Sequence, residues 1–429
     1  MVAVTATETK RTIEAVWRIE SARVIAGLAR MVRDVGLAEE LAQDALVAAL
    51  EQWPESGVPK NPGAWLMATG KRRAIDHLRR KERFDRKVTE IGRDLETGGD
   101  AATADFDAVL EEDFGDDLLR LVFTSCHPVL STEARVALTL RLLGGLTTPE
   151  IARAFLVSES TVAQRIVRAK RALAEAKVPY EVPQGPELAE RLSSVLEVLY
   201  LVFNEGYSAT AGDDWMRPAL CEEALRLGRI LTGLMPKEPE AHGLVALMEI
   251  QASRSRARIG PSGEPVLLLE QDRGRWDQLL IRRGLAALTR AEELGGTGGP
   301  YYLQAAIAAC HARARTAEET NWIRIAALYE ALAGITPSPV VELNRAVAVS
   351  MAFGPAAGLE LVDQLLAEPS LKAYHLLPSV RGDFLAKLDR LEEARAEFER
   401  AATLTRNERE RALLLERAAA CADGKAPAR

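Results

Sequence analysis

Two stretches of this 429-residue chain gather arginine, glutamine and hydroxyl side chains at helical spacing, one at residues 65–83 and the other at residues 147–173. Guanidinium groups pair with phosphate oxygens, and Gln and Arg also form hydrogen bonds with base edges in the DNA major groove. These residue types therefore favour recognition of nucleic acid over catalysis. The competing interpretation is a pair of helices with solvated charged faces, and neither stretch alone decides between the two.

The stretch at 147–173 predicts a helix-turn-helix. Thr147 and Glu150 fit a capping box, and Pro149 is tolerated in a first turn because the amide that it lacks would be unpaired there. Ser158 can cap the second helix. A buried stripe along that helix is predicted at Val162, Ile166, Ala169 and Leu173.

The outer face of this second helix is the predicted DNA-reading surface. In helix-turn-helix proteins that face enters the major groove, where Gln and Arg read bases and further polar residues hold phosphates. We expect Gln164 and Arg168 to touch bases and the others to touch phosphates. The full set of candidates is Ser160, Thr161, Gln164, Arg165, Arg168 and Arg171.

The stretch at 65–83 predicts a second basic helix. At about 100° per residue, Ala74, Ile75 and Leu78 share one side of it. The net charge of the whole chain is −7, so a basic arc on the opposite side is a local feature that would attract a polyphosphate. The arginines of this arc are Arg72, Arg73, Arg79, Arg80 and Arg83.

The order and spacing of these motifs resemble the bacterial extracytoplasmic-function (ECF) sigma factors of the sigma-70 family. The matching motifs lie at residues 36–46, 65–80 and 160–173, and the likeness extends from about residue 13 to residue 176. The resemblance implies an all-α fold, in which two small helical sigma domains are joined by an acidic linker and followed by a larger helical-repeat domain. The second sigma domain contains the helix-turn-helix.

The resemblance also implies boundaries for these parts. Residues 10–83 would form sigma region 2, which binds core polymerase and recognises the −10 element, and residues 118–177 would form region 4, which recognises the −35 element. Residues 84–117 hold twelve acidic and three basic side chains, as expected of a linker. Residues 187–429 would form a helical regulatory domain related to tetratricopeptide repeats (TPR), with a hinge at 178–186.

Segments 201–207 and 302–311 resemble a subgroup of these sigma factors that has a C-terminal extension related to TPR. An internal repeat also favours a helical-repeat domain. The stretches 351–358 and 386–394 resemble each other about 36 residues apart, close to the roughly 34-residue TPR period. Residues 253–277 interrupt the helical pattern. They are expected to be a small hairpin or an ordered loop, and a solvated surface loop is preferred over a segment that contacts a ligand or docks a domain.

Two further sites follow from the resemblance. The polymerase-binding helix would span residues 37–50, although the polar residues on its outer arc could equally well just face water. The loop at 54–61 would capture an unstacked base, with Lys60 and Asn61 contacting phosphate or a base edge. The polymerase-binding candidates are Glu40, Gln43, Asp44 and Val47, opposite Leu41, Ala45 and Ala49.

The implied partners are core RNA polymerase, promoter DNA and a small YCII-related protein of the DGPF-domain type, with no cofactor and no metal. No apolar run approaches the roughly 20 residues that span a bilayer, so a cytoplasmic protein without a membrane partner is expected. The cysteines are too scattered for a disulfide framework or a zinc site and are expected to be buried free thiols. They are Cys126, Cys221, Cys310 and Cys421.

Two other classes of function compete with a sigma factor. One is a conventional helix-turn-helix regulator with a helical sensor domain, which would bind duplex DNA without polymerase. The other is an enzyme, but Cys310 and His311 are adjacent on a predicted helix and point about 100° apart, which does not suit a nucleophile and its base. The residues considered for catalysis are Glu205, Asp272, Cys310, His311 and His375.

Overall fold

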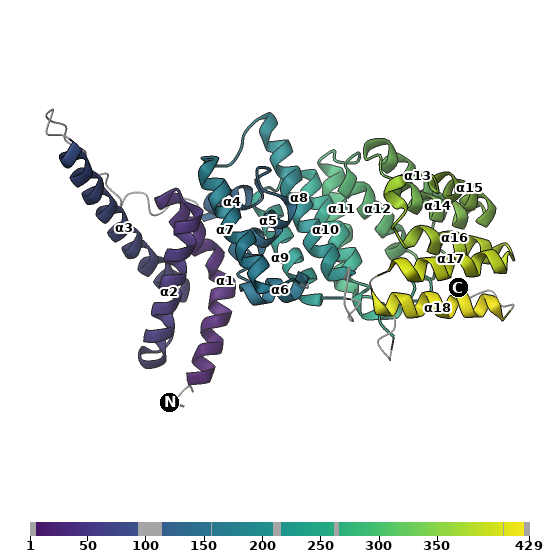
Figure 1. The fold of residues 1–429 in the computed structure, drawn as a ribbon, viewed down its shortest axis with the longest axis horizontal. Helices are drawn as coiled ribbons and strands as arrows, with labels where there is room; N and C mark the ends of the chain where they lie inside the picture. The colour runs from purple at the N-terminus through teal and green to yellow at the C-terminus, as the bar shows by residue number, and fades with distance from the viewer. Residues whose placement is uncertain are drawn as a thin grey trace. The chain divides into compact units, whose positions relative to one another are not determined.

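The computed structural model describes residues 6–92, 114–155, 157–208, 216–260, 266–405 and 407–423. Within these ranges every regular element is a helix, which confirms the predicted all-α class. The chain divides into two compact units, residues 1–198 and residues 199–429, and each is described by itself (Figure 1). None of the described helices is long and apolar enough to cross a membrane.

The first unit opens with three helices that pack on one another, α1 (Ala6–Val32), α2 (Val35–Ser56) and α3 (Pro62–Gly92). Asp34 starts α2 by accepting a hydrogen bond from the Leu37 amide at 3.0 Å. Gly70 lets α3 approach α1, because a Cβ there would lie only 2.8 Å from a methyl carbon of Leu28. The largest buried side chains of this bundle include Ile25, Leu28, Trp53 and Leu66.

The C-terminal ends of α2 and α3 differ from the sequence prediction. The loop was expected to begin at Pro54, but α2 continues through Pro54 to Ser56 and ends where Gly57 adopts a φ of 81°. A proline in the last turn removes one hydrogen bond to the carbonyl of Leu50, which water can replace since Leu50 is exposed. Helix α3 likewise runs past Arg83 to Gly92, into the predicted acidic linker.

The rest of that linker falls on residues 93–113, which lie outside the described residues, and on the start of the next helix. Helices α4 (Phe114–Ser125), α5 (Thr132–Leu142), α6 (Thr148–Phe155) and α7 (Glu159–Glu175) form a second small bundle. Its core contains Leu121, Phe123, Leu138 and Leu140.

All four cysteines of the chain are buried and free, as predicted.

Helix α8 (Pro186–Tyr207) begins after the predicted hinge, yet its first half packs on the second bundle. The Arg191 guanidinium donates to the Phe123 carbonyl at 3.0 Å, and the Ser194 hydroxyl donates to the Cys126 carbonyl at 2.6 Å. The division between the two compact units therefore falls within this helix, between Val198 and Leu199, rather than at residues 178–186.

The second unit is a succession of helices in which each packs on the next along the chain from α12 to α18. Such nearest-neighbour packing is typical of a helical-repeat domain. Its helices are α9 (Pro218–Leu234), α10 (Pro239–Ala252), α11 (Gln278–Glu293), α12 (Pro300–Arg313), α13 (Trp322–Ile335), α14 (Pro339–Phe353), α15 (Pro355–Leu365), α16 (Leu376–Lys387), α17 (Leu391–Leu404) and α18 (Glu408–Ala422).

The two similar stretches noted in the sequence are equivalent helix–turn–helix junctions, one between α14 and α15 and the other between α16 and α17. Small residues allow the paired helices to approach. A Cβ at Gly358 would lie 2.5 Å from the Cβ of Ser350, and one at Gly382 would lie 3.0 Å from the Phe398 ring. The packing supports the interpretation of this repeat as a TPR-like element.

Within the interruption, residues 253–260 and 266–277 form an ordered loop, and the burial of Arg258 and Trp276 contradicts the preferred interpretation as a solvated surface loop there. It contains two short 3-10 helices, Ser255–Ala257 and Arg273–Arg275. Trp276 is buried in a cluster with Ala257 and Ile281, and the Asp277 amide donates to the Ser253 carbonyl at 2.9 Å. Apolar burial and backbone hydrogen bonds hold this loop against the helices.

Candidate nucleic-acid interface

The helix-turn-helix forms with the predicted caps. The Thr147 amide donates to Glu150 Oε2 at 2.8 Å, and the Glu150 amide donates in return to the Thr147 hydroxyl at 3.4 Å. At the second helix, the Ser158 hydroxyl accepts from the Thr161 amide at 3.1 Å. These bonds satisfy amides that would otherwise be unpaired at the two helix starts, and they confirm both predicted N-termini.

Burial along α7 follows the predicted stripe. Val162, Ile166, Ala169 and Leu173 are all buried, so the remaining sides of the helix face outward. Val167 lies on the outward side with 64% of its surface exposed. Among the candidates for DNA contact, Ser160, Gln164, Arg168 and Arg171 are exposed, and Thr161 and Arg165 are half-buried.

Three of these candidates have local partners. The Arg171 side chain donates to Glu175 at 2.6 Å, and the hydroxyls of Ser160 and Thr161 each lie 2.8 Å from the Ser158 hydroxyl. These contacts lie at the surface, so a phosphate could replace them at small cost. Gln164 and Arg168 have no side-chain partner among the described residues, which leaves their donors available.

The arginines of α3 also lie on its outer face. Ala74 is fully buried beneath them, and Arg72, Arg79, Arg80 and Arg83 are exposed. The fifth, Arg73, is half-buried and forms an ion pair with Asp44 of α2 at 3.0 Å. That pair joins a predicted DNA-binding residue to a predicted polymerase-binding residue.

The segment before α3 presents both of its predicted residues to solvent. Lys60 is exposed, and Asn61 uses its side-chain oxygen to accept from the Ala64 amide at 3.1 Å, which caps α3. The amide group of Asn61 keeps its two donors for a ligand. Trp65 is partly buried and packs edge-on against Trp53 with ring centroids 5.2 Å apart.

The outer arc of α2 is exposed as its spacing predicts. Leu41, Ala45 and Ala49 are buried on one side. On the other, Glu40, Asp44 and Val47 are exposed, while Gln43 is half-buried and donates to Glu39 at 2.5 Å. The helix therefore presents a mixed acidic and apolar surface.

Family models match three parts of the chain. The model "Sigma-70 region 2" matches residues 18–84, "Sigma-70, region 4" matches residues 120–173, and a family of unknown function, DUF6596, matches residues 191–292. The ECF RNA polymerase sigma factor SigK of Mycobacterium ulcerans is 29% identical over 155 residues, which is 35% of this chain and 78% of that protein. The chain belongs to the ECF sigma factors of the sigma-70 family.

Other relatives extend or repeat this likeness. SigK of Mycobacterium tuberculosis is 29% identical over 154 residues, 35% of this chain and 78% of its own length. An uncharacterised protein of Rhizobium meliloti, R00370, is 44% identical over 393 residues, 91% of this chain and 92% of its own length. The crystal structure of yeast Tom70 aligns with 97% of this chain and 85% of its own, at 12% identity and a TM-score of 0.31.

Sequence reasoning missed a buried carboxylate that joins the two sigma regions. Glu39 of α2 is only 3% exposed, and it forms ion pairs with Arg141 of α5, at 2.6 Å, and with Lys170 of α7. Burial by itself raises the pKa of Glu39, but Lys170 and Arg141 outweigh it and hold that pKa below its ordinary value. The available signal was a charged residue on the buried face of α2, between Ala38 and Ala42.

Further contacts connect region 2 of this sigma factor to region 4. Arg18 of α1 pairs with Glu150 at 3.1 Å, and Arg30 of α1 lies 3.5 Å from Asp117 of α4. The Tyr180 hydroxyl lies 3.0 Å from the carbonyl of Ala26 and 2.9 Å from that of Asp117, so its proton is shared between the two regions. Asp117, assigned to the linker by sequence, is part of this buried interface.

The residues considered for catalysis have structural partners instead. Glu205 pairs with Arg217, His375 lies 3.1 Å from Glu410, and Asp272 accepts from the Gly274 amide at 2.9 Å. Burial, together with Arg254 and Arg273, lowers the pKa of His311 to about 3, and burial raises the pKa of Cys310. Across the described ranges, no group of three or more His, Cys, Asp or Glu side chains could hold a metal ion.

Proposed function

We propose that this chain is an alternative sigma factor that binds core RNA polymerase and directs it to promoters with defined −10 and −35 elements. The observation that carries the proposal is the pairing of two outward polar faces, on α3 and on α7, within parts that match sigma-70 regions 2 and 4 in that order. Such a function requires no catalysis by the chain itself and would place it in the cytoplasm with polymerase.

Region 2 would hold the opened −10 element. Strand opening costs base stacking, so the protein must bind the open form more tightly than the duplex. Lys60 and Asn61 lie exposed at the start of α3, where they could contact an unstacked base. The backbone phosphates would pair with Arg72, Arg73, Arg79, Arg80 and Arg83, for which Arg73 would leave Asp44.

Region 4 would read the −35 element through α7. Gln164 and Arg168 extend from the outward face without local partners and are our candidates for base contacts. Ser160 and Thr161 lie in the first turn, where backbone amides also favour phosphate. Arg165 and Arg171 would add phosphate contacts farther along the helix.

Core polymerase would bind the exposed arc of α2. Glu40 and Asp44 supply negative charge, and Val47 supplies an apolar contact with 49% of its surface exposed. Gln43 lies between them and is tied to Glu39. The carboxylates would give charge complementarity to a basic surface of the polymerase, and Val47 would add an apolar contact.

A conventional helix-turn-helix regulator is less well supported, because residues 18–84 match sigma-70 region 2 and a conventional regulator has no need of it. The decisive experiment is run-off transcription with purified core polymerase on a genomic fragment library. Transcripts that start at common upstream motifs would support a sigma factor. Duplex binding with neither polymerase association nor transcripts would overturn the proposal in favour of the regulator.

We further propose that the helical-repeat unit regulates the sigma regions and recruits a partner, for which a small YCII-related protein of the DGPF-domain type is our candidate. Because the first half of α8 belongs to the first compact unit, a truncation should end after Tyr207 rather than at residue 176. Promoter activity in cells that is unchanged by this truncation would remove any regulatory role. Co-purification with the small protein tests the partner separately.

A further inference from the structure

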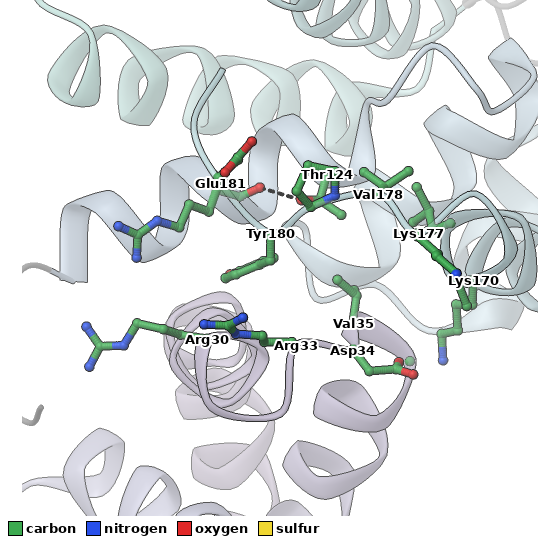
Figure 2. Close-up of a pocket in the computed structure, with 15 residues that line it drawn as sticks. Arg30, Arg33, Asp34, Val35, Thr124, Lys170, Lys177, Val178, Tyr180 and Glu181 are labelled. Carbon is green, nitrogen blue, oxygen red and sulfur yellow. Dashed lines mark hydrogen bonds between the residues drawn. The ribbon is translucent and has the colours of Figure 1, made fainter. Parts of the chain in front are cut away.

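A cavity of about 680 Å³ lies within residues 1–198, between the corner joining α1 to α2 and the segment that follows α7 (Figure 2). Helix α4 contributes Arg120 and Thr124 to its wall, and the Thr124 hydroxyl donates to the Arg120 carbonyl at 2.8 Å. Small-molecule sites have volumes of roughly 300–1,000 Å³. The cavity is therefore large enough for a ligand the size of a nucleotide.

Positive charge dominates the lining, although the chain as a whole is acidic with a net charge of −7. The acidic lining residues are Asp34 and Glu181, and an oxygen of Asp34 already accepts from the Leu37 amide at the start of α2. A local excess of cations in a concave site attracts anions. The cationic lining residues are Arg30, Arg33, Arg120, Lys170 and Lys177.

Two of these cations have no acidic partner. Arg30 and Arg120 face Asp117, and Lys170 is held by Glu39. Arg33 and Lys177, in contrast, form no ion pair with any residue that the structure describes. Figure 2 shows Arg33 beside Tyr180 and Lys177 near Lys170, so the available charges come from both regions.

The backbone at these two residues is unusual. Arg33 has a φ of 52° and Lys177 a φ of 49°, and in the described part of the chain Asp389 is the one other non-glycine residue with a positive φ. Each residue follows the end of a helix, where glycine normally adopts this conformation without strain. A cation at the C-terminal end of a helix is favoured by the helix dipole, and at these two positions it also lines the cavity.

Part of the wall is apolar. Val35, Leu173 and Val178 line the cavity beside the ring of Tyr180, whose hydroxyl is held by the carbonyls of Ala26 and Asp117. Inorganic phosphate alone would leave these surfaces unused. A ligand with an anionic end and an uncharged body would contact both the cationic and the apolar residues of the lining.

We propose that this cavity binds a phosphate-bearing small molecule of nucleotide size, with its phosphates paired to Arg33 and Lys177 and its body against the apolar wall. The ligand would touch region 2 and region 4 at once and would stabilise their packing through its binding energy. Binding does not depend on the proposed sigma-factor function, but any effect of the ligand on transcription does.

Isothermal titration calorimetry of the full chain with ATP, inorganic triphosphate and adenosine tests the ligand class. We expect saturable binding of ATP, weaker binding of triphosphate and none of adenosine. The Arg33→Asn/Lys177→Asn double variant removes both charges with a residue that tolerates positive φ, and it should weaken ATP binding at least about tenfold. The matched control, Lys237→Asn/Arg256→Asn, alters exposed cations outside the cavity and should leave binding unchanged.

Amide hydrogen exchange of the full chain tests the bridging geometry. ATP should slow exchange both at residues 33–37 and at residues 177–181. Protection on one side alone would overturn the bridging, and so would the absence of protection in a protein that binds ATP. The binding proposal itself is overturned if neither ATP nor triphosphate binds saturably, if adenosine binds as well as ATP, or if the double variant binds ATP like the wild type.

Discussion

Two sets of arginines, one from each compact unit, differ in what their guanidinium groups contact. In residues 1–198, Arg79, Arg80 and Arg168 extend into solvent from helices whose other faces are buried. In residues 199–429, the guanidinium of Arg258 is buried 3.6 Å above the Tyr207 ring and donates to the Tyr207 carbonyl, and Arg273 donates to the carbonyls of His311 and Ala314. A count of basic residues therefore does not locate a nucleic-acid site.

What separates the two sets is the chemistry around each guanidinium. An exposed arginine without partners keeps its donors for phosphate or bases, whereas one that stacks on an aromatic ring and bonds to carbonyls stabilises its own domain. Burial lowers the pKa of Arg258 and of Arg273, which reflects the cost of holding a charge there. The comparison yields four predictions, in order of decreasing effect.

The largest effect is expected for Arg258→Ala. Loss of the stacked and hydrogen-bonded guanidinium should destabilise the second unit by about 3 kcal/mol. Urea denaturation of the full chain measures this change, with Arg256→Ala as the control, because Arg256 is exposed two residues earlier in the same loop. Equal stability of the two variants would remove the distinction between inward and outward arginines.

Glu39→Gln should weaken the packing of region 2 on region 4 by about 2 kcal/mol. This loss is smaller than that expected on breaking a fully buried ion pair, because the side chains of Arg141 and Lys170 are 22% and 21% exposed. Since the folded pKa of Glu39 lies below 4.5, its contribution is present above that pH and is lost as pH falls through the folded pKa. Acid unfolding of region 2 and region 4, followed by hydrogen exchange, should show this dependence in the wild type. A variant with the same acid transition would contradict the role of Glu39.

Arg168→Ala should reduce promoter affinity by about 1–2 kcal/mol and relax specificity at one position of the −35 element, with no loss of stability. Competition binding of the sigma–polymerase complex to promoters with single-base changes measures both effects. Arg153→Ala is the control, since Arg153 is exposed on α6 and outside the predicted contacts. A uniform loss across all sequences would reassign Arg168 to a phosphate.

The fourth prediction concerns Asp44→Ala, which should change stability only slightly. Its ion pair with Arg73 is exposed, at 57% and 39% of the two side chains, so the variant should stay within about 0.5 kcal/mol of the wild type. Binding to core polymerase, measured by pull-down titration, should nevertheless weaken. Unchanged binding would favour the interpretation that this arc of α2 merely faces water.

Much of this fold could be predicted from local sequence. Thr147, Glu150 and Ser158 cap helices through bonds to amides within three residues, so their roles do not depend on the rest of the chain. The buried stripe of α7 follows equally from helical periodicity. The candidate site on α3 and α7 could be predicted for the same reason. Once the buried stripe of a helix is known, the residues on its other sides are expected to face outward.

Other features could not be predicted. Pro54 reads as a helix breaker, but the last turn of α2 tolerates it because the carbonyl that loses its partner is exposed. The loop at 253–277 has the composition of a surface loop, and only contacts with distant helices bury Trp276 and Arg258. Such contacts leave no periodic signal in the sequence.

The sequence alone determined the all-α class, the starts of α6 and α7 and the two outward basic faces, since each depends on bonds or periodicities that span a few neighbouring residues. The order of region 2 before region 4 came from the resemblance to sigma factors. Only the tertiary structure decided which charges are already paired. Glu39 meets Arg141, 102 residues away, and a cavity between α1 and α7 leaves Arg33 and Lys177 without acids. Such pairings depend on how helices pack, and packing is a property of surfaces that the chain brings together only on folding.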